Sequence, residues 1–282
     1  MASAVNGREI ILETLLSITR DGQYSHIALK NVLDTYQYLD KKERAFITRV
    51  VDGTLERMIE LDYIINQFSK VKVNKMKPVI RNILRSAVYQ LKYMDSVPNS
   101  AVCNEAVKLA TKKGFSSLKG FVNGVLRNIE RNLDAITYPN LSVKYSMPEW
   151  ILNQWFSTYD ENTVETMLQD FLEEKPTTIR CNLNQMTVDE LKAALEKEGV
   201  CVENHPYLSD ALWISSYNYL GDLETFQKGA FHVQDISSML VSHIAQPKDG
   251  DYVIDVCAAP GGKATELGAK LQGQGVLVAN DI

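Results

Sequence analysis

Residues 251–267 read DYVIDVCAAPGGKATEL, and this stretch decides the fold of the C-terminal part of the chain. An apolar run from Tyr252 to Ile254 leads into a turn of small residues with two adjacent glycines, and a helix-like segment follows. Because glycine has no Cβ, Gly261 and Gly262 let the backbone bend sharply and approach a ligand closely. In an open parallel sheet, cofactors usually bind at the first strand-to-helix turn. The stretch therefore predicts a strand, a ligand-binding turn and a helix.

The residues after the turn indicate which ligand it holds. Lys263 lies at the start of the helix, where free amides and the positive end of the dipole favour a carboxylate or a phosphate. The glycine spacing matches neither GxxxxGK[ST] nor GxGxxG, so a nucleotide-dependent dehydrogenase is disfavoured. A second strand-like run at 275–282, GVLVANDI, contains Asp281, and an acid at this position commonly holds ribose hydroxyls. The pattern favours an adenosine-containing cofactor over a tight turn with a surface acid.

Composition and charge indicate a soluble chain of about two domains. The 282 residues are 45% hydrophobic and 23% charged, and no apolar run approaches the ~20 residues that span a bilayer. The net charge is −5, but residues 1–138 have 21 basic against 14 acidic side chains, and residues 139–282 have 9 against 21. Residues 69–93 have seven basic side chains and no acid, which suits either a solvated helical surface or an RNA contact.

Four scattered cysteines favour reduced thiols in a cytosolic protein. No CxxC pair is present and the four histidines are also scattered, so we expect neither a zinc site nor another metal. The N-terminus lacks a basic region followed by an apolar stretch and a cleavage site, so we expect no secretion.

Hydrophobic periodicity predicts helices through the first ~135 residues, including one that Pro78 opens, and short connections imply a bundle. Two amphipathic helices follow near 149–159 and 161–172. Residues 177–184, 187–199 and 200–206 then predict a strand, a helix with a Thr187–Glu190 capping box and a second strand, which we interpret as a β-α-β unit. Residues 211–216 are a further candidate strand, and 233–245 a helix.

The segment DVCAAPGGKATE resembles motif I of the RNA cytosine-C5 methyltransferases of the RsmB/NOP family. GAFHVQDISSML resembles the family's lead-in to the catalytic domain, and KYSMPEWILNQW with KPTTIRCNLNQMTVDELKAAL resembles its preceding RNA-binding module. SVPNSAVCNEAVKLA and FVNGVLRNI resemble the NusB-type helical domain that one branch of the family has at its N-terminus. The resemblance runs along the whole chain.

The resemblance implies a multidomain fold. It consists of an all-α NusB-like helical bundle (1–138), linker helices and a small α+β RNA-binding module (139–232), and the start of an α/β Rossmann-like methyltransferase domain (233–282). It implies methylation of a cytosine C5 in 16S rRNA with S-adenosyl-L-methionine, by a cytoplasmic monomer with no membrane or metal partner.

The resemblance also assigns residues to the site. The S-adenosylmethionine loop would consist of Cys257, Ala258, Ala259, Pro260, Gly261, Gly262 and Lys263, with Asp281 on the ribose hydroxyls. Cys257 would be a buried, packed thiol of that loop. We further expect Lys75, Lys77, Arg81 and Arg85 to contact RNA phosphates.

The family's nucleophilic cysteine has a T-C-S context and its product-releasing cysteine a P-C-S context, and neither occurs here. The resemblance therefore implies that the nucleophile lies beyond residue 282 and that the chain is a truncated member of the family. We expect such a chain to bind the cofactor weakly or not at all and not to methylate RNA. The alternative is a non-catalytic NusB-like protein that binds RNA, for example in antitermination, although such a protein has no need of CAAPGGK and Asp281.

Overall fold

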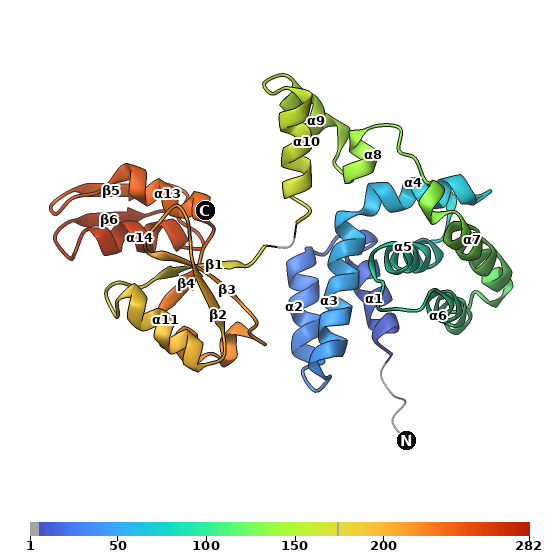
Figure 1. The fold of residues 1–282 in the computed structure, drawn as a ribbon, viewed down its shortest axis with the longest axis horizontal. Helices are drawn as coiled ribbons and strands as arrows, with labels where there is room; N and C mark the ends of the chain where they lie inside the picture. Colours follow the sequence, from blue (N-terminus) through green and yellow to red (C-terminus); the bar gives the residue numbers. More distant parts are fainter. Residues whose placement is uncertain (1–5, 174) are drawn as a thin grey trace. The chain divides into compact units, whose positions relative to one another are not determined.

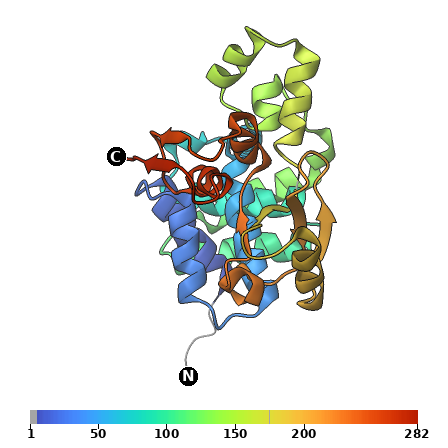
Figure 2. The ribbon, with the colours of Figure 1, turned by 90° about the vertical axis from the view of Figure 1, so that its left-hand side faces the viewer.

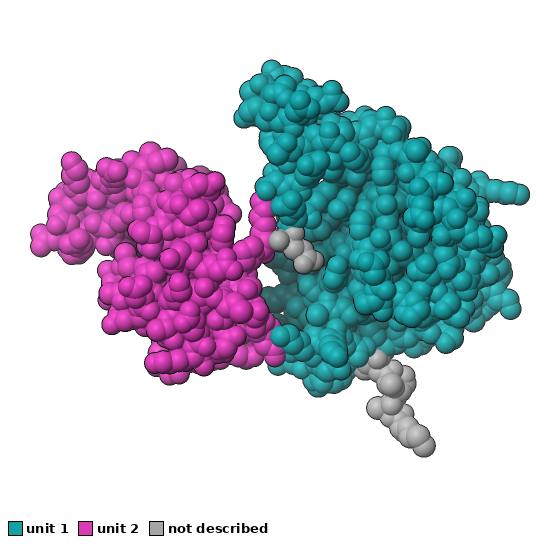
Figure 3. All heavy atoms as spheres, viewed as in Figure 1, with its two compact units in different colours: residues 1–173 teal, residues 174–282 magenta. Residues whose placement is uncertain are grey.

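The computed structural model describes residues 6–173 and 175–282, which form two compact units, Met1–Glu173 and Glu174–Ile282 (Figure 3). Each unit is described separately below. The domain boundaries at 138/139 and 232/233 that the sequence suggests remain a prediction.

The first unit is helical throughout, as the periodicity predicts (Figure 1). Its main bundle consists of α1 (Gly7–Thr19), α2 (Ser25–Thr35), α3 (Lys41–Glu56), α4 (Met58–Phe68), α5 (Pro78–Tyr93), α6 (Asn99–Lys112) and α7 (Lys119–Arg131). Helix α5 contacts α1, α3, α4, α6 and α7, so it is the central helix of the bundle. Its Ile83, Leu84 and Val88 are almost fully buried in the bundle core.

Local sequence sets the ends of these helices. Asp40 caps α3 by accepting the amide of Glu43, and Pro78 occupies the first turn of α5, where a missing N–H removes no helical hydrogen bond. After α6, Gly114 adopts a φ of +86° and ends the helix as predicted.

Three short helices complete the first unit: α8 (Leu141–Tyr145), α9 (Glu149–Phe156) and α10 (Glu161–Asp170). Helices α9 and α10 confirm the two predicted amphipathic helices, whereas α8 was not predicted. Tyr145, Leu152, Val164 and Leu168 form a small core of their own. The Oγ of Ser146 accepts the amide of Ile59 at 3.0 Å, which joins this helical group to α4.

A four-stranded antiparallel sheet opens the second unit, with the order β2-β3-β1-β4. The strands are β1 (Thr177–Cys181), β2 (Cys201–Asn204), β3 (Ala211–Ser215) and β4 (Phe231–Val233), and helix α11 (Val188–Lys197) joins β1 to β2 with the predicted capping box. The predicted β-α-β unit is present, but β3 lies between its two strands and pairs with both. Strand β4 was not predicted because it has only three residues.

The second sheet contains two parallel strands, β5 (Tyr252–Asp255) and β6 (Val276–Ala279), joined by α14 (Gly262–Lys270). Helix α13 (Ile236–Ala245) packs against α14, which itself contacts β6 (Figure 2). Leu267 and Leu271 are buried, whereas Tyr252, Ile254, Val276 and Val278 remain exposed. Within the described residues one apolar face of this pair of strands is therefore uncovered, as expected for two strands and one helix. The short α12 (Glu224–Gln227) precedes β4.

Among the described residues, 6–173 and 175–282, no helix combines the length and the apolar character that a membrane span requires.

One ion pair in the bundle core is testable by a single substitution. Arg85 is buried, and its guanidinium donates to both carboxylate oxygens of Asp62 at 2.6 Å. Asp62→Asn leaves a buried charge without its counter-ion, so we expect the free energy of unfolding to fall by about 1–3 kcal/mol. Urea unfolding followed by circular dichroism measures this loss, and the exposed Asp95→Asn serves as the control. Equal stability of the two variants would contradict the prediction.

Candidate cofactor site

The glycine turn and the end of β6 line one open cleft of about 510 Å³. Of the predicted cofactor residues, Ala258, Ala259, Pro260, Gly261 and Asp281 line this cleft. The structure therefore brings together two segments that lie at opposite ends of helix α14 in the sequence. Cys257, Gly262 and Lys263 belong to the same loop but do not line the cleft.

Backbone pairing explains why the two segments meet. Because β5 and β6 are parallel, their carboxyl ends lie at the same edge of the sheet. The amide of Asn280 donates to the carbonyl of Asp255 at 2.8 Å, and the amide of Ala258 donates to the carbonyl of Asn280 at 2.9 Å. The Ala259 amide then donates to Oδ2 of Asp281 at 2.6 Å. Each carboxylate oxygen has further lone pairs, so Asp281 can still accept from ribose hydroxyls.

The turn itself has the conformation that glycine permits. Gly261 has a φ of +106°, a region that residues with a side chain rarely adopt, and it precedes the first residue of α14. The first amides of a helix have no partner within the helix, so the N-terminus of α14 offers free donors beside the cleft. Lys263 is exposed in the first turn of that helix.

Five residues that line the cleft were not predicted. Thr265 and Gly268 lie with Gly261 and Ala264 on one face of α14, and Leu277 and Ala279 come from β6. The signal that could have found the α14 residues is helical spacing, because residues three and four apart share a face. Small residues on this face leave room for a flat, apolar ligand surface.

The exposed position of Cys257 corrects the expectation of a buried, packed thiol. Cys257 follows Val256, which is 68% exposed, in the turn beyond β5. Among the described residues, strand β5 is paired with β6 alone. The cysteine is therefore open to solvent.

Three family models match consecutive parts of the chain. The NusB family model matches residues 5–131, the RsmF/B-like methyltransferase ferredoxin-like domain matches 147–218, and the 16S rRNA methyltransferase RsmB/F model matches 242–282. The order of the matches is that of the helical bundle, the antiparallel sheet and the cleft.

The chain is similar to the RsmB/F rRNA methyltransferases.

Individual relatives agree with the family models. The probable ribosomal RNA small subunit methyltransferase B of Bacillus subtilis is 35% identical over 98% of this chain and 62% of its own length. The Synechocystis protein with the same description is 29% identical over 98% of this chain and 64% of its own length. The solved structure of PH0851 has a TM-score of 0.72 at 20% identity and covers 98% of this chain and 64% of that one, which supports the fold. The chain thus spans about three fifths of these RsmB/F relatives.

The basic residues predicted to contact RNA lie in two different environments. Lys75 and Lys77 are exposed, in the connection between α4 and α5, and Arg81 is half-buried in the first turns of α5. Arg85, in contrast, is buried and paired with Asp62, so its guanidinium is not offered to a phosphate. The helical spacing of Arg81 and Arg85 did not distinguish the solvent side of α5 from its core side.

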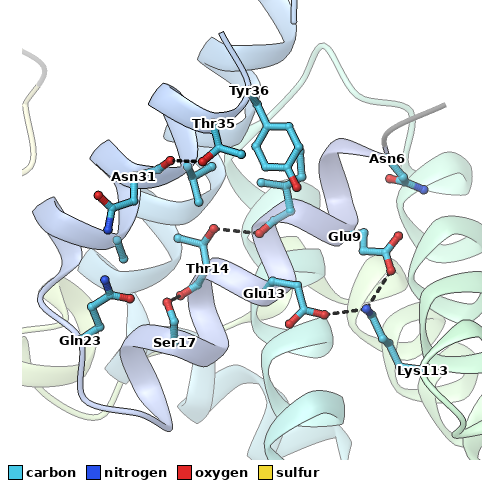
Figure 4. A pocket seen from close by; sticks show the side chains of 13 residues that line it. Asn6, Glu9, Glu13, Thr14, Ser17, Gln23, Asn31, Thr35, Tyr36 and Lys113 are labelled. Carbon is cyan, nitrogen blue, oxygen red and sulfur yellow. Dashed lines mark hydrogen bonds and ion pairs between the residues drawn. The ribbon is translucent and has the colours of Figure 1, made fainter. Parts of the chain in front are cut away.

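A second hollow, of about 610 Å³, lies over α1 and α2 (Figure 4). Its charged groups are paired with one another, because the ammonium of Lys113 contacts Glu9 at 2.7 Å and Glu13 at 2.6 Å. None of the predicted site residues lines it. The cleft at Gly261 and Asp281 is therefore the stronger candidate.

The four thiols should differ in reactivity. Burial raises the pKa of the Cys181 thiol to about 11 and also raises that of Cys103, and a thiol with a raised pKa holds less reactive thiolate at pH 8. Cys201 and Cys257 are exposed. With a chromogenic disulfide at pH 8, we expect two fast equivalents in the native chain and four after denaturation. Cys257→Ser should remove one fast equivalent. Loss of a slow equivalent in that variant would show that Cys257 is buried.

Proposed function

We propose that this chain contributes the RNA-binding part and one wall of the cofactor cleft to an enzyme that methylates C5 of a cytosine in 16S rRNA, using S-adenosyl-L-methionine. The observation that carries the proposal is the shared cleft of the double-glycine turn and Asp281. The RsmB/F family match over residues 242–282 supports the same reaction class. Ribosomal RNA implies the cytoplasm as the place of action.

The residues of the cleft fit S-adenosylmethionine, which supplies an activated methyl group when bound. Asp281 would accept hydrogen bonds from the ribose hydroxyls. The face of α14 that contains Ala264, Thr265 and Gly268 would lie against the adenosine part, together with Leu277. The free amides at the start of α14 and Lys263 would hold the carboxylate of the methionine part.

Methyl transfer to cytosine C5 requires that a nucleophile first add to C6, which makes C5 electron-rich, and in this family a cysteine thiolate is that nucleophile; loss of the C5 proton then expels the thiolate. None of the four thiols of this chain has the T-C-S or P-C-S context. Cys103 and Cys181 are buried, and Cys201 and Cys257 lie outside the lining of the cleft. We therefore propose that none of these four cysteines is the nucleophile, and that the 282 residues alone bind cofactor and RNA without methyl transfer.

The RNA contacts are proposed for the surface around Lys75, Lys77 and Arg81. The NusB family match supports a nucleic-acid role for this unit. A charged patch of this kind holds phosphates without reading sequence, and the choice of nucleotide would come from RNA shape. The alternative function, that of a non-catalytic NusB-like binding protein, would account for residues 5–131 but would not explain the cleft.

The cofactor role is tested by titrating S-adenosylhomocysteine into the chain and three variants. Binding to the parent chain should be weak, since the cleft is open on one side. Asp281→Asn should weaken it about tenfold or more, because a charge-assisted hydrogen bond contributes roughly 1.5–3 kcal/mol. Gly261→Ala should weaken it as well, because the new Cβ strains a backbone at φ +106°.

Asp249→Asn, an exposed change outside the cleft, is the matched control and should bind as the parent does. Equal affinity of all three variants would exclude this cleft as the cofactor site. Chemical-shift changes confined to residues 258–268 and 276–281 would be the direct positive result.

The RNA role is tested by the salt dependence of binding to a 16S rRNA fragment. Replacement of Lys75, Lys77 and Arg81 by glutamine should weaken binding and reduce the slope of log K against log salt by about 2–3, roughly one per phosphate contact. Lys108→Gln is the control, because the ammonium of Lys108 is already paired with Glu105. An unchanged slope in the triple variant would remove these residues from the interface.

A further inference from the structure

Three side chains with metal-binding atoms meet in the second unit, although they are far apart in the sequence. Asp210 immediately precedes β3, His243 lies in the last turn of α13, and Glu266 lies in α14. Nε2 of His243 is 3.4 Å from Oδ1 of Asp210 and 3.6 Å from Oε1 of Glu266. All three atoms lie within 4.8 Å of one another.

These same three atoms are buried and have no hydrogen-bond partner. The side chain of Glu266 is only 3% exposed, and that of Asp210 is 13% exposed. A buried polar atom without a partner costs about 1–3 kcal/mol, so three unsatisfied atoms that converge on one point need an explanation.

The charge of the cluster favours a cation. Two buried carboxylates face one buried guanidinium, that of Arg180, whose Nε is 3.6 Å from Oε2 of Glu266. With a neutral His243, one negative charge remains uncompensated away from water. Buried charges are paired or bind metals, because isolation in a medium of low polarity is costly.

The surrounding side chains hold Glu266 in a fixed orientation. Nε2 of Gln234 donates to Oε2 of Glu266 at 2.9 Å, and Nε of Arg180 donates to Oε1 of Gln234 at 2.9 Å. These bonds use one carboxylate oxygen and leave Oε1 facing His243 and Asp210. Hydrogen bonds of this kind commonly orient the ligands of metal sites.

We propose that Asp210, His243 and Glu266 bind one divalent transition-metal ion, with zinc as the preferred ion. In a tetrahedral zinc site, bonds of ~2.0–2.1 Å place the ligand atoms about 3.4 Å apart, close to the two separations measured from His243. One nitrogen and two oxygen ligands suit zinc, and a water molecule completes the tetrahedron. The ion fastens α13 and α14 to the antiparallel sheet, and this role is independent of the cofactor and of RNA.

The test is zinc binding by the 282-residue chain with Cys201→Ser and Cys257→Ser, which removes the exposed thiols as competing ligands. After chelator treatment, zinc is titrated against a chromophoric chelator. We expect one equivalent per chain and a higher melting temperature with zinc. Glu266→Gln and His243→Gln should each lose at least tenfold in affinity. His26→Gln, an exposed histidine of the first unit, is the matched control and should bind as the parent does.

Zinc uptake below a tenth of an equivalent would overturn the site, and so would equal affinity in the Glu266→Gln, His243→Gln and His26→Gln variants. A rise in melting temperature on acidification without metal uptake would also overturn it, because a protonated His243 would then supply the missing charge. If the variants fail to fold, the absorption spectrum of the parent chain loaded with cobalt is the deciding measurement. A tetrahedral cobalt spectrum without a thiolate band supports the site, and its absence contradicts it. No cofactor or RNA is present, so the result is separate from that of the cofactor titration.

Discussion

The hydrogen bond from the Ala259 amide to the carboxylate of Asp281 is the contact on which the proposed cofactor cleft depends. This bond holds the loop that follows β5 against the residues that follow β6. It lies just beyond the last backbone pairs of the two strands. Parallel pairing brings the two ends to one edge, and glycine at 261 allows the turn that connects them to α14. Together the three bring the two walls of the cleft to one place.

The sequence predicts those features that are encoded locally. Pro78, the Thr187–Glu190 box and Gly114 each act within a few residues, and the structure has helix ends at all three. The position of β3 between β1 and β2 could not be predicted in this way, because strand order depends on contacts between segments that are distant in the sequence. The three-residue β4 has too short a pattern to be recognised, although its pairing with β1 completes the sheet.

Burial is the property that sequence reasoning about the site could not supply. Arg81 and Arg85 are one helical turn apart, yet one reaches the surface and the other is enclosed with Asp62. Cys257 belongs to a motif whose small residues suggest close packing, yet its thiol is exposed. In the same way, Asp210, His243 and Glu266 have no spacing that marks them as a group. Their convergence follows from the packing of α13 and α14 beside the sheet.

The hydrogen bonds from Arg180 to Gln234 and from Gln234 to Glu266 join three elements: strand β1, the segment after β4, and helix α14, which lines the cleft. All three side chains are buried, so these elements are not free to be exchanged separately. An engineer who transplanted the antiparallel sheet of another homologue would have to carry over matching partners for Glu266. Otherwise the graft would leave the buried carboxylate of Glu266 without its partners, and a shift of α14 would change the shape of the proposed cofactor cleft.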